Sequence, residues 1–284
     1  MAISATASPV NSGTKGSGFG YLVPALLLVA IFFILPVLML LLRSVLEPEP
    51  GLQNYATLLG STTYLKVFLN TFIVAGVVTV ISIVVGYPVA WLLAIMPERW
   101  ARLVLAIIIL SMWTNLLART YAWMVLLQRT GLINKTLIGL GLIDAPLPLV
   151  NNLVGVTIGM TYIMLPFVIL PLMGVIRSID PATLRAAALC GATRLQCFLR
   201  VLLPLSLPGI ASGALMVFVM SLGYFVTPAL LGGTSNMMLA ELVAQFVQSL
   251  VNWGMGGAAA LVLLVVTLVL YAVQLKYFNP NRAR

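Results

Sequence analysis

Six long hydrophobic runs constrain the fold of this chain more than any other feature. Each is long enough to cross a membrane, since about 30 Å of hydrocarbon takes roughly 20 apolar residues in a helix. Inside lipid the backbone has to satisfy its own hydrogen bonds, so a single crossing segment is expected to be helical. The runs cover about residues 21–42, 68–95, 103–127, 153–176, 207–231 and 255–275. We therefore expect an all-α, polytopic membrane protein with six transmembrane helices.

The remaining sequence leaves no room for a soluble domain. The chain is 62% apolar and 7% charged, which is far from the composition of soluble proteins. Residues 1–19, rich in Ser, Gly, Ala and Thr, are predicted to be a disordered tail, and residues 281–284 a second short tail. The first run is too long for a cleaved signal peptide and lacks a small-x-small cleavage site. One membrane domain over residues 20–280 is predicted.

The distribution of charge predicts how the spans are oriented. If the N-terminus is cytoplasmic, the cytoplasmic segments hold ten of the fifteen Lys and Arg residues, as the positive-inside rule requires. These ten are Lys15, Arg99, Arg102, Arg177, Arg185, Arg194, Arg200, Lys276, Arg282 and Arg284; the outer five are Arg43, Lys66, Arg119, Arg129 and Lys135. Both termini and residues 177–206 are then cytoplasmic. The net charge of +9 mostly reflects this topology, and no nucleic-acid partner is indicated.

Several classes of activity are excluded by the residues that the chain lacks. There is no histidine, so neither a Ser-His nor a Cys-His catalytic pair can form. Zinc binding is not indicated either, because the two cysteines, Cys190 and Cys197, have no further soft ligand nearby. On the cytoplasmic side they are expected to be reduced thiols. No G-x-x-x-x-G-K-[ST] loop is present, so the chain is expected to be non-catalytic and to hold no cofactor.

The segment of residues 177–206 differs from the rest because it is basic and strongly capped. Asp180 followed by Pro181 is a typical start of a helix. Gly191 occupies the position at which a helix ends in a left-handed residue. Thr193 and Gln196 form a T-x-x-Q capping box that starts a second helix, which Pro204 is expected to close. A helix-turn-helix is predicted, either as a docking element for a protein or as an amphipathic loop among anionic lipid headgroups.

This segment resembles the coupling loop, or EAA loop, of ABC-importer permeases, whose pattern is E-A-A-x-x-x-G, nine residues, then I-x-L-P. The matching positions are Arg185, Ala186, Ala187, Gly191, Val201, Leu203 and Pro204, with each spacing kept. The resemblance implies that the loop, with Asp180 as its cap, docks onto a separate ATP-hydrolysing subunit. Arg185 stands where the family has glutamate. Three explanations would account for the arginine at this position. They are sequence drift at a tolerant position, a compensating acidic residue on a dedicated ATPase, and a second permease subunit that keeps the glutamate.

Three other stretches are similar to permeases of the spermidine/putrescine type, in particular to the first of their two permease subunits. They are "NYATLLGSTTYLKVFLNTFIVA", "RTYAWMVLLQRTGLIN", and "GYFVTPALLGG" with the following "NWGMGGAAA". The resemblance implies a polyamine as solute, with opines, aminophosphonates or ferric complexes as alternatives within the same branch. A secondary transporter driven by an ion gradient and a membrane scaffold are the alternatives from other classes.

The same resemblance implies a set of partners. A second permease subunit completes the path, a dimer of ATP-binding subunits carries ATP and Mg²⁺, and a periplasmic solute-binding protein delivers the solute. Membrane lipid surrounds the spans, and the expected location is the bacterial inner membrane.

Polar residues and interruptions within the hydrophobic runs are candidates for the translocation path. Prolines at 88, 166 and 171, and the stretch of residues 223–233, are expected to interrupt their spans; ordinary helix kinks are the alternative for the prolines. The candidate path residues are Asn70, Asn115, Tyr121, Tyr162, Tyr224 and Glu241. Aromatic faces can meet a cation, although Tyr121 also suits a membrane interface. Glu241 is expected either to attract a cationic solute or to pair with Arg119.

Overall fold

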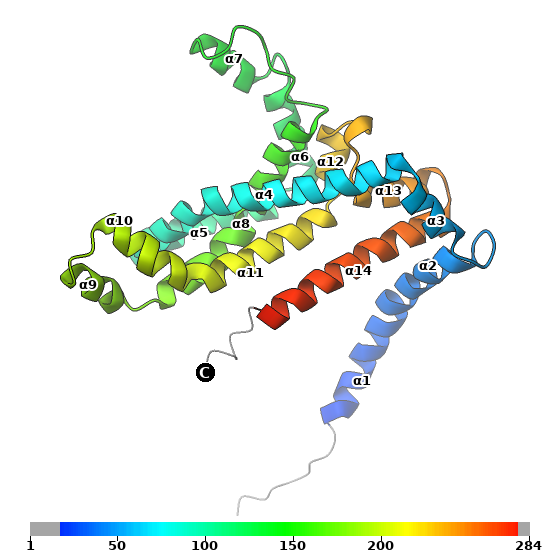
Figure 1. Ribbon diagram of the computed structural model, residues 1–284, viewed down its shortest axis with the longest axis horizontal. Helices are drawn as coiled ribbons and strands as arrows, with labels where there is room; N and C mark the ends of the chain where they lie inside the picture. The colour runs from blue at the N-terminus through cyan, green and yellow to red at the C-terminus, as the bar shows by residue number, and fades with distance from the viewer. Residues whose placement is uncertain (1–17, 278–284) are drawn as a thin grey trace, which may run out of the picture.

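The computed structural model describes residues 18–277 of the chain. The predicted tails of residues 1–19 and 281–284 lie outside the described residues, apart from residues 18 and 19. The described part is helical and contains no strand, as the all-α prediction requires. Most helices run along one axis. A hairpin of α9 (Pro181–Leu189) and α10 (Arg194–Cys197) lies at one end, and α3 (Gln53–Gly60) at the other (Figure 1).

Five helical segments are long and apolar enough to cross a membrane, and a bent pair supplies a sixth. The bent pair is α5 (Glu98–Trp113) with α6 (Leu116–Leu127) and α7 (Leu132–Gly139), which meet at 96°. The first of the five is Leu22–Leu46, which is formed by α1 (Gly18–Val29), η1 (Ala30–Ile34) and α2 (Leu35–Leu46). Two others are the single helices α4 (Thr62–Ile95) and α8 (Leu153–Ser178). The last two are Arg194–Leu222, formed by α10, η2 (Phe198–Leu202) and α11 (Leu203–Leu222), and Trp253–Gln274 within α14 (Trp253–Tyr277). The six predicted spans are confirmed, with the third one broken.

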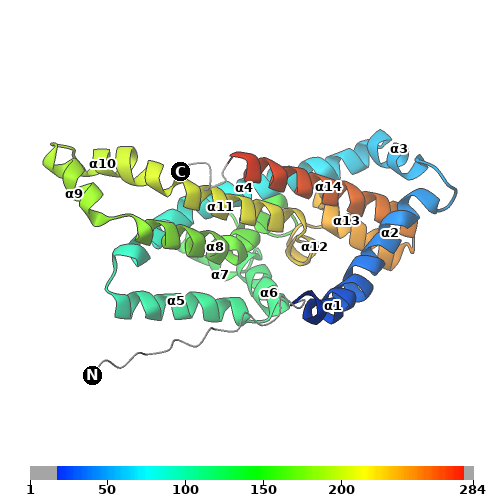
Figure 2. The ribbon, with the colours of Figure 1, turned by 90° about the horizontal axis from the view of Figure 1, so that it is seen from below.

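The core of the bundle forms where α4, α8 and α11 pack side by side (Figure 2). Val168 of α8 is fully buried at the point where the three helices meet. A Cβ on Gly213 of α11 would lie 3.2 Å from the Val168 Cα, and a Cβ on Gly86 of α4 would lie 3.2 Å from the Val168 Cγ1. Small residues that let backbones approach are the usual basis of helix packing in membranes. Glycine at both positions therefore sets the distance between these three spans.

The predicted interruptions are only partly correct. Pro88 lies inside α4, and Pro166 and Pro171 lie inside α8, without ending either helix. Neighbouring helices stabilise such residues in a packed bundle, so these prolines do not open the spans. The break after α11 is confirmed, because that helix ends at Leu222 and α12 (Val226–Leu231) begins after a short gap.

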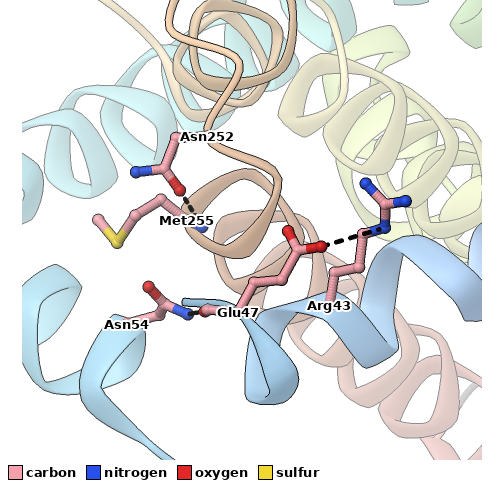
Figure 3. Close-up of polar contacts among 5 residues, drawn as sticks. All are labelled: Arg43, Glu47, Asn54, Asn252 and Met255. Carbon is pink, nitrogen blue, oxygen red and sulfur yellow. Dashed lines mark hydrogen bonds and ion pairs between the residues drawn. The ribbon is translucent and has the colours of Figure 1, made fainter. Parts of the chain in front are cut away.

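At the end opposite the hairpin, polar contacts shape the turn that follows the first span and the start of the last span (Figure 3). Asn54 of α3 donates from Nδ2 to the backbone oxygen of Glu47 at 2.6 Å, and the Glu47 carboxylate lies 3.6 Å from Arg43 Nε. Asn252 accepts from the Met255 N–H at 3.0 Å, at the start of α14. A Cβ on Gly257 of α14 would collide with the backbone oxygen of Leu40, so α2 and α14 are in close contact.

Candidate functional site: the α9–α10 hairpin

The first helix of the hairpin begins as the sequence predicts. The Asp180 carboxylate accepts a hydrogen bond from the Ala182 N–H at 2.8 Å, and Pro181 is the first helical residue. The carboxylate thus satisfies one of the free N–H groups that every helix start exposes. α9 has no buried residue in this chain, so its shape comes from local capping rather than from packing.

The turn of the hairpin depends on the backbone of Gly191. Its φ is +86°, the left-handed conformation that the sequence predicts for this residue. The Gly191 N–H donates to the Ala188 oxygen at 3.0 Å, and the Ala192 N–H donates to the Ala187 oxygen at 3.2 Å. These two bonds form a Schellman motif, which closes the end of α9. A Cβ on Gly191 would meet no atom of this chain within 4 Å, so the turn faces open space.

The second helix also begins as predicted but does not end as predicted. Both bonds of the Thr193–Gln196 capping box are present, at 2.8 and 3.3 Å. Pro204 does not close the helix, because Arg194–Leu222 runs on as one segment of 29 residues. The π-helical turn η2 directly precedes Leu203 and Pro204 and widens the helix where proline lacks an N–H. The coupling-loop positions Leu203 and Pro204 therefore lie at the start of a span.

The continuous helix that follows the turn of the hairpin is longer than the hydrocarbon core is thick. At 1.5 Å per residue, 29 residues extend about 43 Å. The hydrocarbon core measures only about 30 Å. The segment therefore overshoots the core by about 13 Å, and Figure 1 shows α9 and α10 beyond the ends of the neighbouring spans.

Aromatic contacts join the hairpin to the core of the bundle. The Phe198 ring centroid lies 5.6 Å from that of Tyr87 at an interplanar angle of 87°, and 6.2 Å from that of Trp91. The Tyr87 hydroxyl lies 3.0 Å from Ser206 Oγ on α11. Arg177 donates from Nη2 to the Leu93 oxygen at 3.1 Å, which connects α8 to α4. A displacement of the hairpin would thus reach α4, α8 and α11 directly.

The outer surface of the hairpin is basic and partly apolar. The side chains of Arg185, Arg194 and Arg200 are exposed, and within the described part of the chain none of them forms an ion pair. Ala186 is exposed and Ala187 half-buried, while Leu189 is 89% exposed. A hollow of about 500 Å³ lies between the two helices and α4, lined mainly by apolar groups such as Trp91, Leu184 and Phe198. The exposed surface of the hairpin therefore combines positive charge with apolar side chains.

The candidate path residues on the third to fifth spans lie around the two helix breaks. Asn115 caps α6, accepting from the N–H groups of Leu117 and Ala118 at 2.9 and 3.3 Å, so its side chain has a structural role. The Tyr162 hydroxyl lies 3.1 Å from Ser111 Oγ, and its ring packs 5.5 Å from Trp123. Tyr121 is 49% exposed, on the same helix as Trp123. Tyr224 lies in the gap between α11 and α12.

Asn70 and Glu241 belong to a different region, at the end opposite the hairpin. Glu241 lies on α13 (Leu239–Ala244), outside the candidate spans, and one of its carboxylate oxygens is buried without a hydrogen-bond partner. Burial raises the pKa of this carboxyl, while a hydrogen bond from the Met238 backbone lowers it. The predicted pair with Arg119 is wrong: among the described residues the two form no ion pair, and Arg119 donates to the Met112 oxygen at 3.5 Å.

A comparison with known protein families matches residues 56–283 to the family described as binding-protein-dependent transport system inner membrane component. The chain belongs to this family. It is 34% identical over 260 residues to the spermidine/putrescine transport system permease protein PotB of Escherichia coli strain K12, covering 89% of this chain and 93% of that protein. With PotB of Haemophilus influenzae it shares 35% identity over 232 residues, covering 81% of this chain and 79% of that protein.

The fold agrees with the family. A bacterial ABC transporter that imports the acidic polysaccharide alginate matches with a TM-score of 0.71 at 19% identity, covering 91% of this chain and 95% of that one. The alginate transporter in complex with its periplasmic protein gives 0.73 at 19% identity, covering 92% and 94%. The family match and the PotB relatives identify the chain as a permease subunit of an ABC importer, and the solved structures agree in fold.

Proposed function

We propose that this permease subunit imports a polyamine of the spermidine or putrescine kind. The observation that carries the proposal is the 34–35% identity to PotB proteins over most of both chains. The likeness to the alginate transporters, at 19% identity, supports the fold alone. Exposed aromatic side chains at the break of the third span, among them Tyr121 and Tyr162, offer faces on which an ammonium group can rest. Glu241 adds a carboxylate near the outer end.

Uptake of labelled solute tests this proposal. A strain that lacks this chain should lose uptake of radiolabelled spermidine or putrescine, and a plasmid copy should restore it. Excess unlabelled polyamine should compete with the label, whereas an opine, an aminophosphonate or a ferric complex should not. Competition by one of these other solutes, with none from polyamines, would assign the same machinery to that solute instead.

The proposed mechanism requires partners. A second permease subunit supplies the other half of the path, and a dimer of ATP-binding subunits, which hold ATP and Mg²⁺, receives the hairpin. A solute-binding protein delivers the solute from the periplasm. When the ATPases close, they move the hairpin, and the Phe198 contacts with Tyr87 and Trp91 carry that motion into α4. Access to the path then switches from one side of the membrane to the other.

The proposed location is the bacterial inner membrane, with the hairpin and both termini in the cytoplasm. Lys135 on α7 and Cys190 in the hairpin are both exposed. In intact cells, an impermeant maleimide should leave Cys190 unlabelled. It should label a cysteine introduced by Lys135→Cys in a chain whose two native cysteines are replaced by serine. Labelling of Cys190 from outside would invert this topology and contradict the coupling role of the hairpin.

Substitution of Gly191 tests whether the hairpin couples ATP hydrolysis to transport. Gly191→Asp should abolish most uptake while the protein still inserts, since it adds a side chain and a negative charge to the exposed turn. The left-handed backbone costs a non-glycine residue roughly 1–2 kcal/mol, and Asp is among those that tolerate it best. Association of the ATPase with the membrane complex, together with ATP turnover, would show whether docking or coupling is lost.

Two further variants control for this change. Gly141 also has a left-handed φ, +69°, and no atom within 4 Å of its Cβ position, but it lies in the loop after α7. Gly141→Asp should therefore leave transport intact. Arg185→Glu restores the family residue on the exposed face of α9. It should disturb transport little unless the ATPase carries an acidic residue opposite Arg185. Normal transport by Gly191→Asp with the ATPase bound would remove the hairpin from the mechanism.

A further inference from the structure

Arg119, in the first turn of α6, lies just after the break of the third span without a counter-charge from this chain. Its Nε is buried and has no hydrogen-bond partner, while Nη2 donates only a long bond of 3.5 Å to the Met112 oxygen. Residues 18–277 contain all six acidic residues of the chain, yet no carboxylate oxygen among them lies within 4.0 Å of the Arg119 guanidinium. An anionic partner of Arg119 therefore has to come from outside the chain.

A half-buried arginine of this kind needs such a partner. Arginine stays charged in proteins, so it does not escape the cost of burial by becoming neutral. Removing a charge from water without compensation costs free energy, and buried charges are paired for this reason. Of the guanidinium nitrogens only Nε is enclosed without a partner, so the group is still accessible through its other nitrogens. The side chain is thus placed to bind an anionic group that approaches from one side.

The surroundings of Arg119 are the two helix breaks that the candidate path residues line. The next residue, Thr120, is fully buried, and its hydroxyl oxygen lies 3.3 Å from that of Thr227 on α12. The charge of Arg119 reaches the Tyr224 hydroxyl, in the gap between α11 and α12. A Cβ on Gly223, beside Tyr224, would meet no atom of this chain within 4 Å. This chain therefore leaves one side of the gap uncovered.

The exposed backbone at the breaks indicates what covers that side. Thr114 and Asn115 at the first break, and Gly223 and Phe225 at the second, are exposed and lie outside regular helix. Non-helical backbone inside a membrane is tolerated only where protein covers it or where it lines a water-filled cavity. Lipid is therefore excluded as the neighbour of these segments. In the proposed function the protein on this side of the path is the second permease subunit.

The sign of the charge identifies the group that Arg119 binds. A polyamine carries positive charge, so an uncompensated guanidinium beside the path would repel it. A carboxylate removes this repulsion, and its two oxygens match the planar, forked donors of a guanidinium. The proposed solute has no carboxylate of its own. An Asp or Glu side chain of the second permease subunit is the source that fits both the solute and the uncovered backbone.

We propose that Arg119 forms an ion pair with a carboxylate of the second permease subunit across the gap, and that this pair neutralises the path for a cationic solute. The inference rests on the proposed function for the second subunit and for the solute. Arg119 does not bind the polyamine itself. It holds the partner's carboxylate in place and cancels a charge that would otherwise oppose the passage of each ammonium group.

An exchange of charges between the two permease subunits of the complete transporter tests the proposal. Arg119→Glu brings two carboxylates together, so it should lower both polyamine uptake and the recovery of the second permease with this chain, each by about tenfold or more. Each acidic residue of the second permease is then changed to arginine in turn. One of these changes should restore both readouts in the Arg119→Glu background, which identifies the carboxylate.

Two variants control for the loss of folding and for charge in general. Arg119→Lys keeps the positive charge and should retain most of the uptake and of the recovered second permease. Arg129→Glu makes the same charge reversal in the exposed turn after α6, away from the breaks, and should leave both readouts unchanged.

The other outcomes contradict the ion pair. Equal uptake and recovery for Arg119→Glu and the wild type would overturn it, and so would a loss that no change in the second permease restores. If Arg119→Glu assembled normally and lost only the uptake of a carboxylate-bearing solute such as an opine, the solute would supply the carboxylate instead. Recovery of the second permease is measured without solute. A wild-type transporter that takes up no polyamine would therefore contradict the proposed function, while the exchange of charges would still decide the ion pair.

Discussion

The absence of water in the hydrocarbon core is the constraint on which the rest of this structure depends. Every backbone group there needs a partner, so a span can break only where other helices cover it. Residues 18–277 contain two such breaks, after Trp113 and after Leu222. They lie together: α6 packs against α12, and Thr120 and Thr227 approach to 3.3 Å between their hydroxyl oxygens. The exposed aromatic residues Tyr121 and Tyr162 lie near the first of these breaks.

The two ends of the bundle present different surfaces. At one end, helix caps and a glycine turn determine the shape of the hairpin. Its surface presents arginines and the exposed side chain of Leu189. At the other end, the first turns of α4 and the segment from Ser235 to Gln245 line a polar cavity that contains one lysine, Lys66. Continuous helices connect the two ends, and contacts at Val168 set the distance between α4, α8 and α11. In the proposed function, motion imposed at one end therefore reaches the other through rigid elements.

Local signals could be predicted from the sequence, and contacts between distant segments could not. Asp180, Gly191 and the Thr193–Gln196 pair act within a few residues, and all are found as predicted. The prediction that Pro204 ends the second helix is wrong because a π-helical turn accommodates the proline, and no residue pattern predicts such a turn. The break before Leu116 was missed because hydropathy runs through it, although Asn115 is a typical N-cap. Phe198 gains its role only from tertiary packing against Tyr87 and Trp91.

In the proposed function, the hairpin carries the action of the ATPase into the membrane. Cross-linking from native Cys190, which is exposed beside the turn, tests this most directly. In the complete transporter, a short photoreactive maleimide on Cys190 should join this chain to the ATP-binding subunit, and the yield should change between nucleotide-free and ATP-bound states. Cross-links to lipid alone, or a yield to the ATPase that nucleotide leaves unchanged, would show that the hairpin does not couple the ATPase to the spans.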